Sequence, residues 1–276
     1  MDFLLEPARP ATIEVEGEIR YGRSDAVPSR LDDPATGVAT VVLLASADEA
    51  ETRRSLAALA ETLPAGADVV VVADGGDLAL APSTNVEVVR TSAPLGRGAA
   101  LNMGIRRARA PVVVVIDPSI APSADGVTPL VEALGDTTVA VAGPLGLVST
   151  DLRRFEEVVP STAIVDVAAI QGELIAFRRS DLAARGPVDE GFRFYRNLDV
   201  WLSLVLRDEG EGRAPRRAVA VPGLHFERGE PAAWRLTPAA ERDRLSRRNA
   251  YRVLERFRTR TDLAVPGPVV RSGTDS

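Results

Sequence analysis

The residues best able to do chemistry in this chain are two aspartates that each follow a short apolar run. Asp74 comes after VVVVA at 69–73, and Asp117 comes after VVVVI at 112–116. Runs of β-branched residues separated by helical patterns predict a mainly parallel sheet covered on both faces. Ligands of such sheets bind beyond the carboxyl ends of the strands. We therefore expect Asp74 and Asp117 to lie at the same edge of the sheet.

Each aspartate has a chemical and a purely structural interpretation. In IDPS, Asp117 and Ser119 could present two oxygens to a hard cation or to a diphosphate. Alternatively, Asp117 caps the turn that follows its strand. Asp74 precedes Gly75 and Gly76, which allow a sharp turn that leaves the carboxylate facing a ligand, or form an ordinary strand-to-loop turn.

A glycine-containing loop at 94–98 leads into the next predicted helix, in PLGRGAALNMG. Gly96 and Gly98 would let this loop pass close to a ligand, and the helix N-terminus is a potential anion site. Arg97 adds a charge-assisted donor for a phosphate. The alternative is an ordinary entry from loop to helix.

Asp199 is the first residue of a predicted helix, Asp199–Arg207. A carboxylate at a helix start, in an aromatic pocket, is a plausible general base. Alternatively, it is a helix-terminal acid above a buried cluster. His225 carries little weight alone, because a lone histidine is more often a packed or exposed residue than a ligand. The aromatic residues near Asp199 are Phe192, Phe194, Tyr195 and Trp201.

Composition narrows the chemistry that these residues can do. The 276 residues contain no cysteine and one histidine, and all 33 Lys+Arg residues are arginine. Missing cysteine excludes disulfides, Cys-based metal sites and a thiol nucleophile. Missing lysine excludes a Schiff-base enzyme and the P-loop lysine. The chemistry must therefore rest on carboxylates, hydroxyls, arginines, backbone amides and one imidazole.

Charge and hydropathy bear on the binding partners and the cellular location of the protein. The net charge of −6 argues against nucleic-acid binding, which requires a basic surface. The N-terminus lacks the pattern of a signal peptide, and the longest apolar stretches are too short for a transmembrane segment. We therefore expect a cytoplasmic protein.

Alternating strand and helix patterns predict an α/β fold in one domain. Residues 1–37 are predicted to be an N-terminal extension with one short hairpin or one edge strand in Thr12–Tyr21, and a strand is predicted over Ala168–Phe177. The arginine-rich helix 239–260 could meet anionic lipid as a peripheral membrane contact. The interpretation we favour docks it on the core. The apolar residues expected to dock are Leu245, Tyr251, Leu254 and Phe257.

Blocks in register from about Ala39 to Arg258 resemble glycosyltransferase family 2, the inverting nucleotide-diphosphate-sugar transferases with the GT-A fold. ADGG at 73–76 resembles the family's Asp-Asp-Gly-Ser turn, and IDPS at 116–119 its Asp-x-Asp strand. GRGAALNMG at 96–104 is similar to the segment that precedes that strand. Later blocks are GELIAFRRSDL at 172–182, DEGF at 189–192, LDVWL at 198–202 and SRRNAYRVLERFR at 246–258.

The resemblance implies a mixed, mainly parallel GT-A sheet flanked by helices over 38–262, followed by a flexible tail at 263–276. It implies transfer of a sugar from a nucleotide-diphosphate donor to an unidentified acceptor hydroxyl, with Asp199 as general base. A Mg²⁺ or Mn²⁺ ion would be held by Asp117, Ser119 and His225. The donor-binding residues implied are Ala45, Asp48, Asp74, Gly75, Arg97, Asn102 and Asp117.

The sequence departs from the family pattern at several positions. Ser119 replaces the second aspartate of Asp-x-Asp, Ala73 the first aspartate of the nucleotide turn, and Leu198 the glutamate before the base. With Ser119 at this position, the donor diphosphate could complete the metal site, or the protein could be metal-independent. The alternative function is that of a catalytically silent relative that binds a nucleotide sugar or a partner protein. A nucleotidyltransferase-like enzyme ranks last, because the loop after the first strand, ASADEAETRR at 45–54, is acidic.

Overall fold

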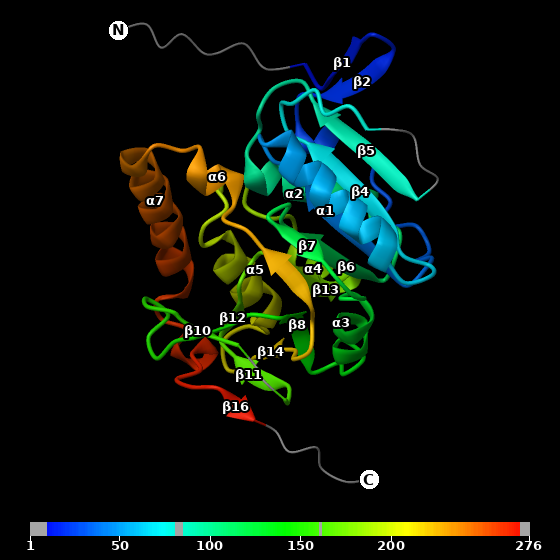
Figure 1. Ribbon diagram of the computed structural model, residues 1–276. Helices are drawn as coiled ribbons and strands as arrows, with labels where there is room; N and C mark the ends of the chain where they lie inside the picture. The colour runs from blue at the N-terminus through cyan, green and yellow to red at the C-terminus, as the bar shows by residue number, and fades with distance from the viewer. Residues whose placement is uncertain (1–9, 81–84, 160–161, 271–276) are drawn as a thin grey trace, which may run out of the picture.

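A computed structural model describes residues 10–80, 85–159 and 162–270, which form one large sheet with helices on both faces (Figure 1). The parallel part comprises β2, β5, β4, β3 and β6, and β13 runs antiparallel between β6 and β8. This confirms the predicted mixed α/β sheet. In spatial order the strands are β1 (Thr12–Val15), β2 (Glu18–Tyr21), β5 (Val86–Thr91), β4 (Asp68–Ala73), β3 (Ala39–Leu44), β6 (Val112–Ile116), β13 (Leu174–Arg178), β8 (Val139–Gly143), β14 (Arg217–Ala220), β11 (Val165–Val167) and β16 (Val269–Val270).

The apolar runs form central strands because both faces of the sheet are covered. Along β3, Val41 and Leu43 face one apolar cluster, whereas Val42 and Leu44 face the other. Successive side chains of a strand point to opposite faces, so an uninterrupted apolar run can be buried on both. Helices α1 (Glu49–Thr62) and α3 (Thr128–Ala133) cover the first face, and α2 (Arg97–Arg107) and α5 (Leu198–Arg207) the second.

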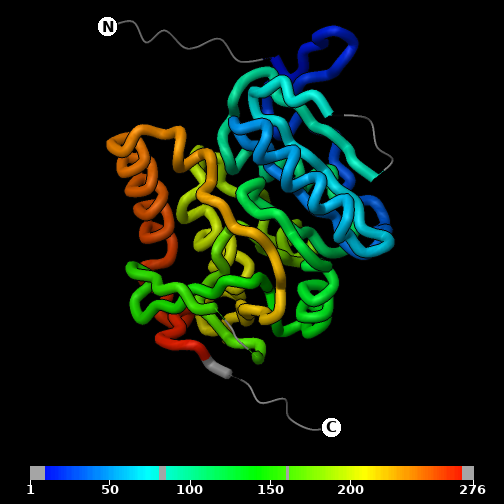
Figure 2. The backbone as a smooth tube through the Cα atoms, in the orientation of Figure 1, coloured from blue at the N-terminus to red at the C-terminus, as the bar shows by residue number. Residues whose placement is uncertain are grey.

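Short strands lie beyond the carboxyl ends of β6 and β8. Strand β7 (Ile120–Pro122) pairs with β15 (Phe226–Arg228), while β10 (Glu156–Val158), β9 (Gly146–Val148) and β12 (Ala169–Ile170) form a separate three-stranded sheet. The tube in Figure 2 shows the segment with β15 crossing in front of the central sheet. The remaining helices are α4 (Arg179–Arg185), α6 (Ala232–Arg235) and α7 (Ala239–Phe257).

One strand prediction was wrong. The run Ala168–Phe177 is divided into β12 and β13, with a turn at Gly172 between them. A Cβ at Gly172 would lie 2.6 Å from Cβ of Asp199, so the backbone approaches the helix start there. The apolar pattern gave no sign of this turn, because both pieces are buried.

Segments near both ends of the chain belong to the sheet or the core, although their composition predicted an extension and a tail. The predicted hairpin is present as β1 and β2, and Val27 is fully buried in the core. Strand β16 pairs with β11, so the tail expected at 263–276 is held as far as Val270. Residues 271–276 lie outside the described residues.

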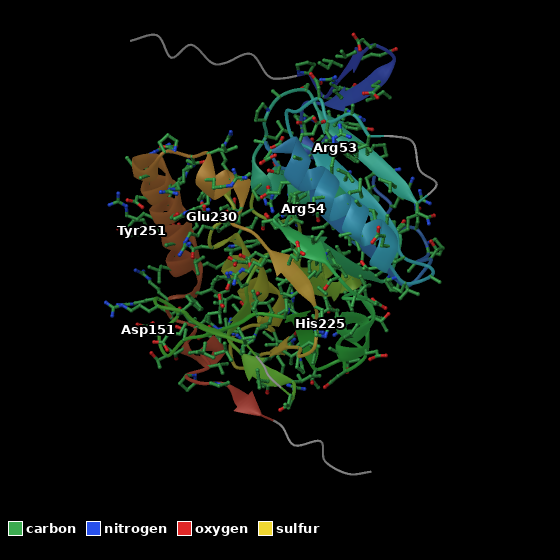
Figure 3. All side chains as sticks on the ribbon, viewed as in Figure 1. Arg53, Arg54, Asp151, His225, Glu230 and Tyr251 are labelled. Atoms are coloured by element: carbon green, nitrogen blue, oxygen red, sulfur yellow. The ribbon has the colours of Figure 1, made fainter. Side chains whose placement is uncertain are left out.

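Helix α7 docks on the core mainly through one face. Phe257 and Val253 are buried, as is Asn249, whereas Tyr251 is 70% exposed. The prediction that Tyr251 docks was therefore wrong, and Figure 3 shows this side chain on the outer side of the helix. Within residues 10–80, 85–159 and 162–270, no helix combines the length and apolar character needed to cross a bilayer.

The packing of α2 against the sheet leads to a test of stability. A Cβ at Gly104 would lie 2.3 Å from Cγ1 of buried Val42, so Gly104→Ala must displace the helix or the strand. We expect a loss of about 1–3 kcal/mol in the free energy of unfolding, measured by urea denaturation. Gly267→Ala is the control, because nothing lies within 4 Å of that position. Equal stability of the two variants would contradict this packing.

Candidate active site

Two cavities open at the edge where β3, β4 and β6 end. One, of about 480 Å³, lies along the ends of β3 and β4 and is called the β4 cleft below; the other, of about 290 Å³, lies beside α5 and is called the α5 cavity. The β4 cleft is lined by residues that include Ala45, Glu49, Asp74, Gly75 and Pro94. The α5 cavity is lined by residues that include Arg97, Asp117, Glu173, Tyr195 and Asp199.

Asp74 fixes the glycine loop that leads into α2. Its Oδ1 accepts from the backbone N–H of Leu95 at 2.7 Å and from the Thr91 hydroxyl at 3.0 Å, and its Oδ2 accepts from the N–H of Gly96 at 2.8 Å. The following Gly75 has φ +78°, and a Cβ there would lie 2.6 Å from the Pro94 ring. Asp74 therefore lines the β4 cleft and also positions the residues that precede Arg97.

The Asp117 carboxylate accepts three hydrogen bonds from neighbouring groups of the protein. Its Oδ1 accepts from the backbone N–H of Ser119 at 3.0 Å and from the Ser119 hydroxyl at 2.7 Å. Its Oδ2 accepts from Nη2 of Arg97 at 2.6 Å, and both side chains of this ion pair are largely buried. The structure thus brings together three residues that the sequence singled out, and the arginine neutralises the carboxylate.

The N-terminus of α2 is not an open anion site, which corrects the expectation from the glycine loop. The backbone N–H groups of Arg97 and Gly98 donate to the carbonyls of Arg193 and Phe192, at 3.2 and 2.8 Å. A Cβ at Gly98 would lie 2.5 Å from the carbonyl oxygen of Asp189, which shows how closely the 189–193 loop approaches. Because these amides are occupied, the positive group that α2 offers to the α5 cavity is the Arg97 side chain.

Asp199 lies in the first turn of α5, in the wall of the α5 cavity. Its carboxylate accepts from the backbone N–H of Gly172 at 2.8 Å and of Val200 at 2.9 Å. Burial raises the pKa of Asp199 above its ordinary value, although these two hydrogen bonds act in the opposite direction. Trp201, two residues further along α5, is buried with its ring 5.6 Å from that of Phe192.

Glu173 is a site residue that the sequence analysis missed. It lines the α5 cavity, and Nε of Arg228 lies 2.8 Å from its carboxylate. Burial raises the pKa of Glu173, Arg228 opposes that shift, and the charges of Asp117 and Asp199 add to it. A polar residue directly after Gly172 inside an apolar run was the available signal, but the run was interpreted as one strand.

The segment after β14, residues 221–238, links the two cavities. Gly229 donates to the carbonyl of Ser119 at 2.8 Å, and Arg235 pairs with Asp48 at 2.9 Å. Asp48 also caps α1 by accepting from the N–H of Ala50 and of Glu51. Asp48 therefore does not line the β4 cleft, although Ala47 and Glu49 on either side of it do, and the pKa of its carboxylate is lowered chiefly by the hydrogen bond from Arg235.

Two of the predicted site residues lie apart from these cavities. Asn102 is buried and bonds to the backbone of Val188 and to the Glu190 carboxylate, so it ties α2 to the 188–190 loop. His225 is exposed and lines a small apolar pocket with Val127. Figure 3 shows His225 and Glu230 at opposite ends of the strand that carries β15.

The residues at Asp117 do not form a metal-binding set. Mg²⁺ is usually bound through one or two carboxylates together with waters and substrate phosphates, so the protein must at least offer a carboxylate to the ion. Here one carboxylate is bonded to a serine and an arginine, and His225 does not line the α5 cavity. In the part of the chain that the structure describes, no three His, Cys, Asp or Glu side chains are grouped to hold a metal ion.

Comparison with known families establishes the family to which this chain belongs. The family described as Glycosyl transferase family 2 matches residues 40–177, which is half of the chain. The chain belongs to glycosyl transferase family 2. The matched part runs from β3 to β13 and so contains Asp74, Arg97 and Asp117, whereas Asp199 lies beyond it. No curated protein matches the chain in sequence.

Solved structures support the GT-A fold for this family 2 chain. GalNAc-T7 with UDP, GalNAc and Mn²⁺ is similar at a TM-score of 0.60 and 16% identity, over 80% of this chain and 48% of the GalNAc-T7 chain. The mannosyltransferase PcManGT from Pyrobaculum calidifontis, with GDP-Man and Mn²⁺, is similar at 0.55 and 19% identity, covering 86% of this chain and 70% of its own. Residues 1–349 of TarS from S. aureus follow at 0.50 and 14% identity, covering 80% and 73%. The chain thus spans about half the length of GalNAc-T7.

The Glu173–Arg228 pair predicts a pH-dependent change in stability. Removing one partner of a fully buried ion pair costs about 3–5 kcal/mol, but Arg228 is 36% exposed and screened by water. We expect Arg228→Met to lower the free energy of unfolding by about 1–2 kcal/mol at neutral pH. The loss shrinks as pH falls through the raised pKa of Glu173, because the protonated carboxyl needs no partner.

This stability change is measured by urea denaturation across pH. Arg53→Met is the matched control, because its ion pair with Glu49 is about half exposed and contributes less than about 0.5 kcal/mol. The double variant Arg228→Met, Glu173→Gln is expected to recover most of the loss at neutral pH. A loss that is constant with pH would show that Arg228 acts by packing alone.

Proposed function

We propose that the protein transfers a sugar from a nucleotide-diphosphate donor to an acceptor hydroxyl, with inversion at the anomeric carbon. One observation carries the proposal: Arg97, Asp117 and Asp199 line the same cavity. A diphosphate beside Arg97 and an acceptor beside Asp199 would therefore flank one reacting carbon. Membership of glycosyl transferase family 2 supports this class of reaction.

The β4 cleft is proposed to hold the nucleoside of the donor. It adjoins the loop that Asp74 fixes, and that loop leads directly to Arg97. The UDP and GDP-Man of the similar structures favour a nucleotide sugar, and the base and the sugar of the donor are left open.

The α5 cavity is proposed to hold the transferred sugar and the acceptor. Burial raises the pKa of Tyr195 in its wall to about 12, so that side chain stays a neutral hydrogen-bond donor.

The chemistry assigned to Asp199 is that of a general base. The acceptor oxygen attacks the anomeric carbon, the bond from that carbon to the diphosphate oxygen breaks, and Asp199 takes the acceptor's proton. Burial suits the carboxylate to this role because it raises the pKa and makes the group a stronger base. The N–H groups of Gly172 and Val200 hold the carboxylate in place.

The second candidate is a silent relative that binds a nucleotide sugar without turning it over. The observation in its favour is Ser119, which stands where the family has a second carboxylate; among the described residues its hydroxyl bonds to Asp117 alone. Both candidates predict donor binding, whereas only the first predicts that the donor is consumed.

Replacement of Asp199 tests the transfer reaction. We expect Asp199→Asn to lower kcat for donor consumption by about 10²–10⁴-fold, because the acceptor proton loses its base, with little change in donor affinity. Turnover is measured by release of the nucleoside diphosphate from UDP-, GDP- and dTDP-sugars. Asp151→Asn is the control, because Asp151 is exposed and lies away from both cavities (Figure 3). Equal rates in both variants would refute the role of Asp199.

The pH profile provides an independent test of the same residue. A base must be ionised, so kcat/KM rises with pH through the pKa of Asp199, which lies above the ordinary value of 3.8. We therefore expect an acid limb displaced to higher pH than an exposed aspartate would give. The limb should be absent from the residual activity of Asp199→Asn. A limb shared by wild type and variant would assign the titration to another group.

A further inference from the structure

We propose that the Arg97 guanidinium takes the place of the divalent cation, so that donor binding and transfer proceed without a metal ion. The inference rests on the proposed sugar transfer and names the group that neutralises the leaving diphosphate. It replaces the expectation that Mg²⁺ or Mn²⁺ binds Asp117, Ser119 and His225. Three features of the site support it.

The first feature is the state of Asp117. Ser119 supplies two hydrogen bonds to Oδ1, and Arg97 supplies a short one to Oδ2. A metal ion bound at this carboxylate would lie beside the Arg97 guanidinium, whose side chain is only 18% exposed. Two cations would then share one carboxylate, which is electrostatically unfavourable.

The second feature is the donor capacity of Arg97. A guanidinium carries five N–H donors and keeps its charge at all working pH values. Among the described residues, the Arg97 guanidinium donates only to Asp117. Arg97 lines the α5 cavity, and a guanidinium with donors to spare suits a bidentate contact with phosphate oxygens.

The third feature is the rigidity with which Arg97 is presented. Gly96 has φ +98°, and a Cβ there would lie 2.9 Å from Cα of Arg193. Asp74 holds the Gly96 N–H from one side, and the Arg97 N–H donates to the Arg193 carbonyl. A positive group that is fixed before the substrate arrives needs little reorganisation when charge develops on the leaving group.

Arg97, Asp199 and Asp117 each have a separate role during transfer of the sugar. When the bond between the anomeric carbon and the diphosphate oxygen breaks, its electron pair leaves with the diphosphate. Arg97 balances that growing negative charge, and Asp199 takes the acceptor proton. Asp117 is a positioning residue, because it holds Arg97 toward the cavity.

Binding of UDP, GDP and dTDP, measured by titration calorimetry in EDTA and then with Mn²⁺, tests the inference. We expect at least one diphosphate to bind wild type in EDTA, with a gain of less than about threefold from Mn²⁺. Arg97→Met should weaken that binding by about 10- to 100-fold, because a charge-assisted contact is lost. Arg97→Lys should restore part of it, and Arg53→Met, an exposed arginine of another ion pair, should bind as wild type does.

A double variant separates this role from a structural one. In Arg97→Met, Ser119→Asp the arginine is removed and a second carboxylate added, so Mn²⁺ should enhance diphosphate binding there by more than tenfold. Thermal unfolding of each variant verifies its fold, and Arg97→Lys replaces Arg97→Met if the latter unfolds. Wild-type binding that requires Mn²⁺ would overturn the metal-free inference and leave the proposed transfer standing. Failure of every diphosphate, with and without Mn²⁺, would overturn both.

Discussion

The carboxylate of Asp117 is the interaction on which the rest of the site depends. It lies at the end of β6, and its backbone N–H bonds to the carbonyl of Glu173 at the start of β13. Its side chain binds the turn at Ser119 on one oxygen and Arg97 of α2 on the other. One aspartate therefore joins a strand, a turn and a helix at the sheet edge. Because it is almost completely buried, each of these hydrogen bonds acts in a medium where an unsatisfied charge would be costly.

The segment 221–238 extends this arrangement across the front of the sheet. Gly229 bonds to the backbone of Ser119, Arg228 pairs with Glu173, and Arg235 pairs with Asp48. Beyond these contacts, the ring of Trp234 lies between the guanidinium groups of Arg196 and Arg242, at 5.1 and 4.3 Å. Arginine makes each of these cationic contacts because the chain contains no lysine. Planar guanidinium groups suit them, since they stack on rings and bind carboxylates through several donors.

The sheet, and the sheet edge at which Asp74 and Asp117 lie, could be predicted from the sequence. The hydrogen-bond partners of the site residues could not. Runs such as Val112–Ile116 are long, apolar and bounded by polar residues, so their strands and the common edge of Asp74 and Asp117 followed from pattern. The bond from Arg97 to Asp117 depends on how α2 sits on the sheet, which no local pattern encodes. Glu173 was missed for a similar reason: the Gly172 turn is dictated by contact with Asp199 in another element.

Among the four carboxylates that line the α5 cavity, Asp117, Glu173 and Asp199 differ in the partner that each has, and Glu157 shares Arg228 with Glu173. Asp117 is paired with Arg97, and Glu173 is paired with Arg228, so both have a guanidinium to balance their charge. Asp199 accepts only backbone N–H groups among the described residues, from Gly172 and Val200. A buried carboxylate with no bonded cation gains most from taking a proton, which is why burial raises its pKa. Of these three carboxylates, Asp199 is therefore the one without a bonded arginine among the described residues, and α5 presents it in the cavity that Arg97 and Asp117 also line, which supports the base role proposed for it.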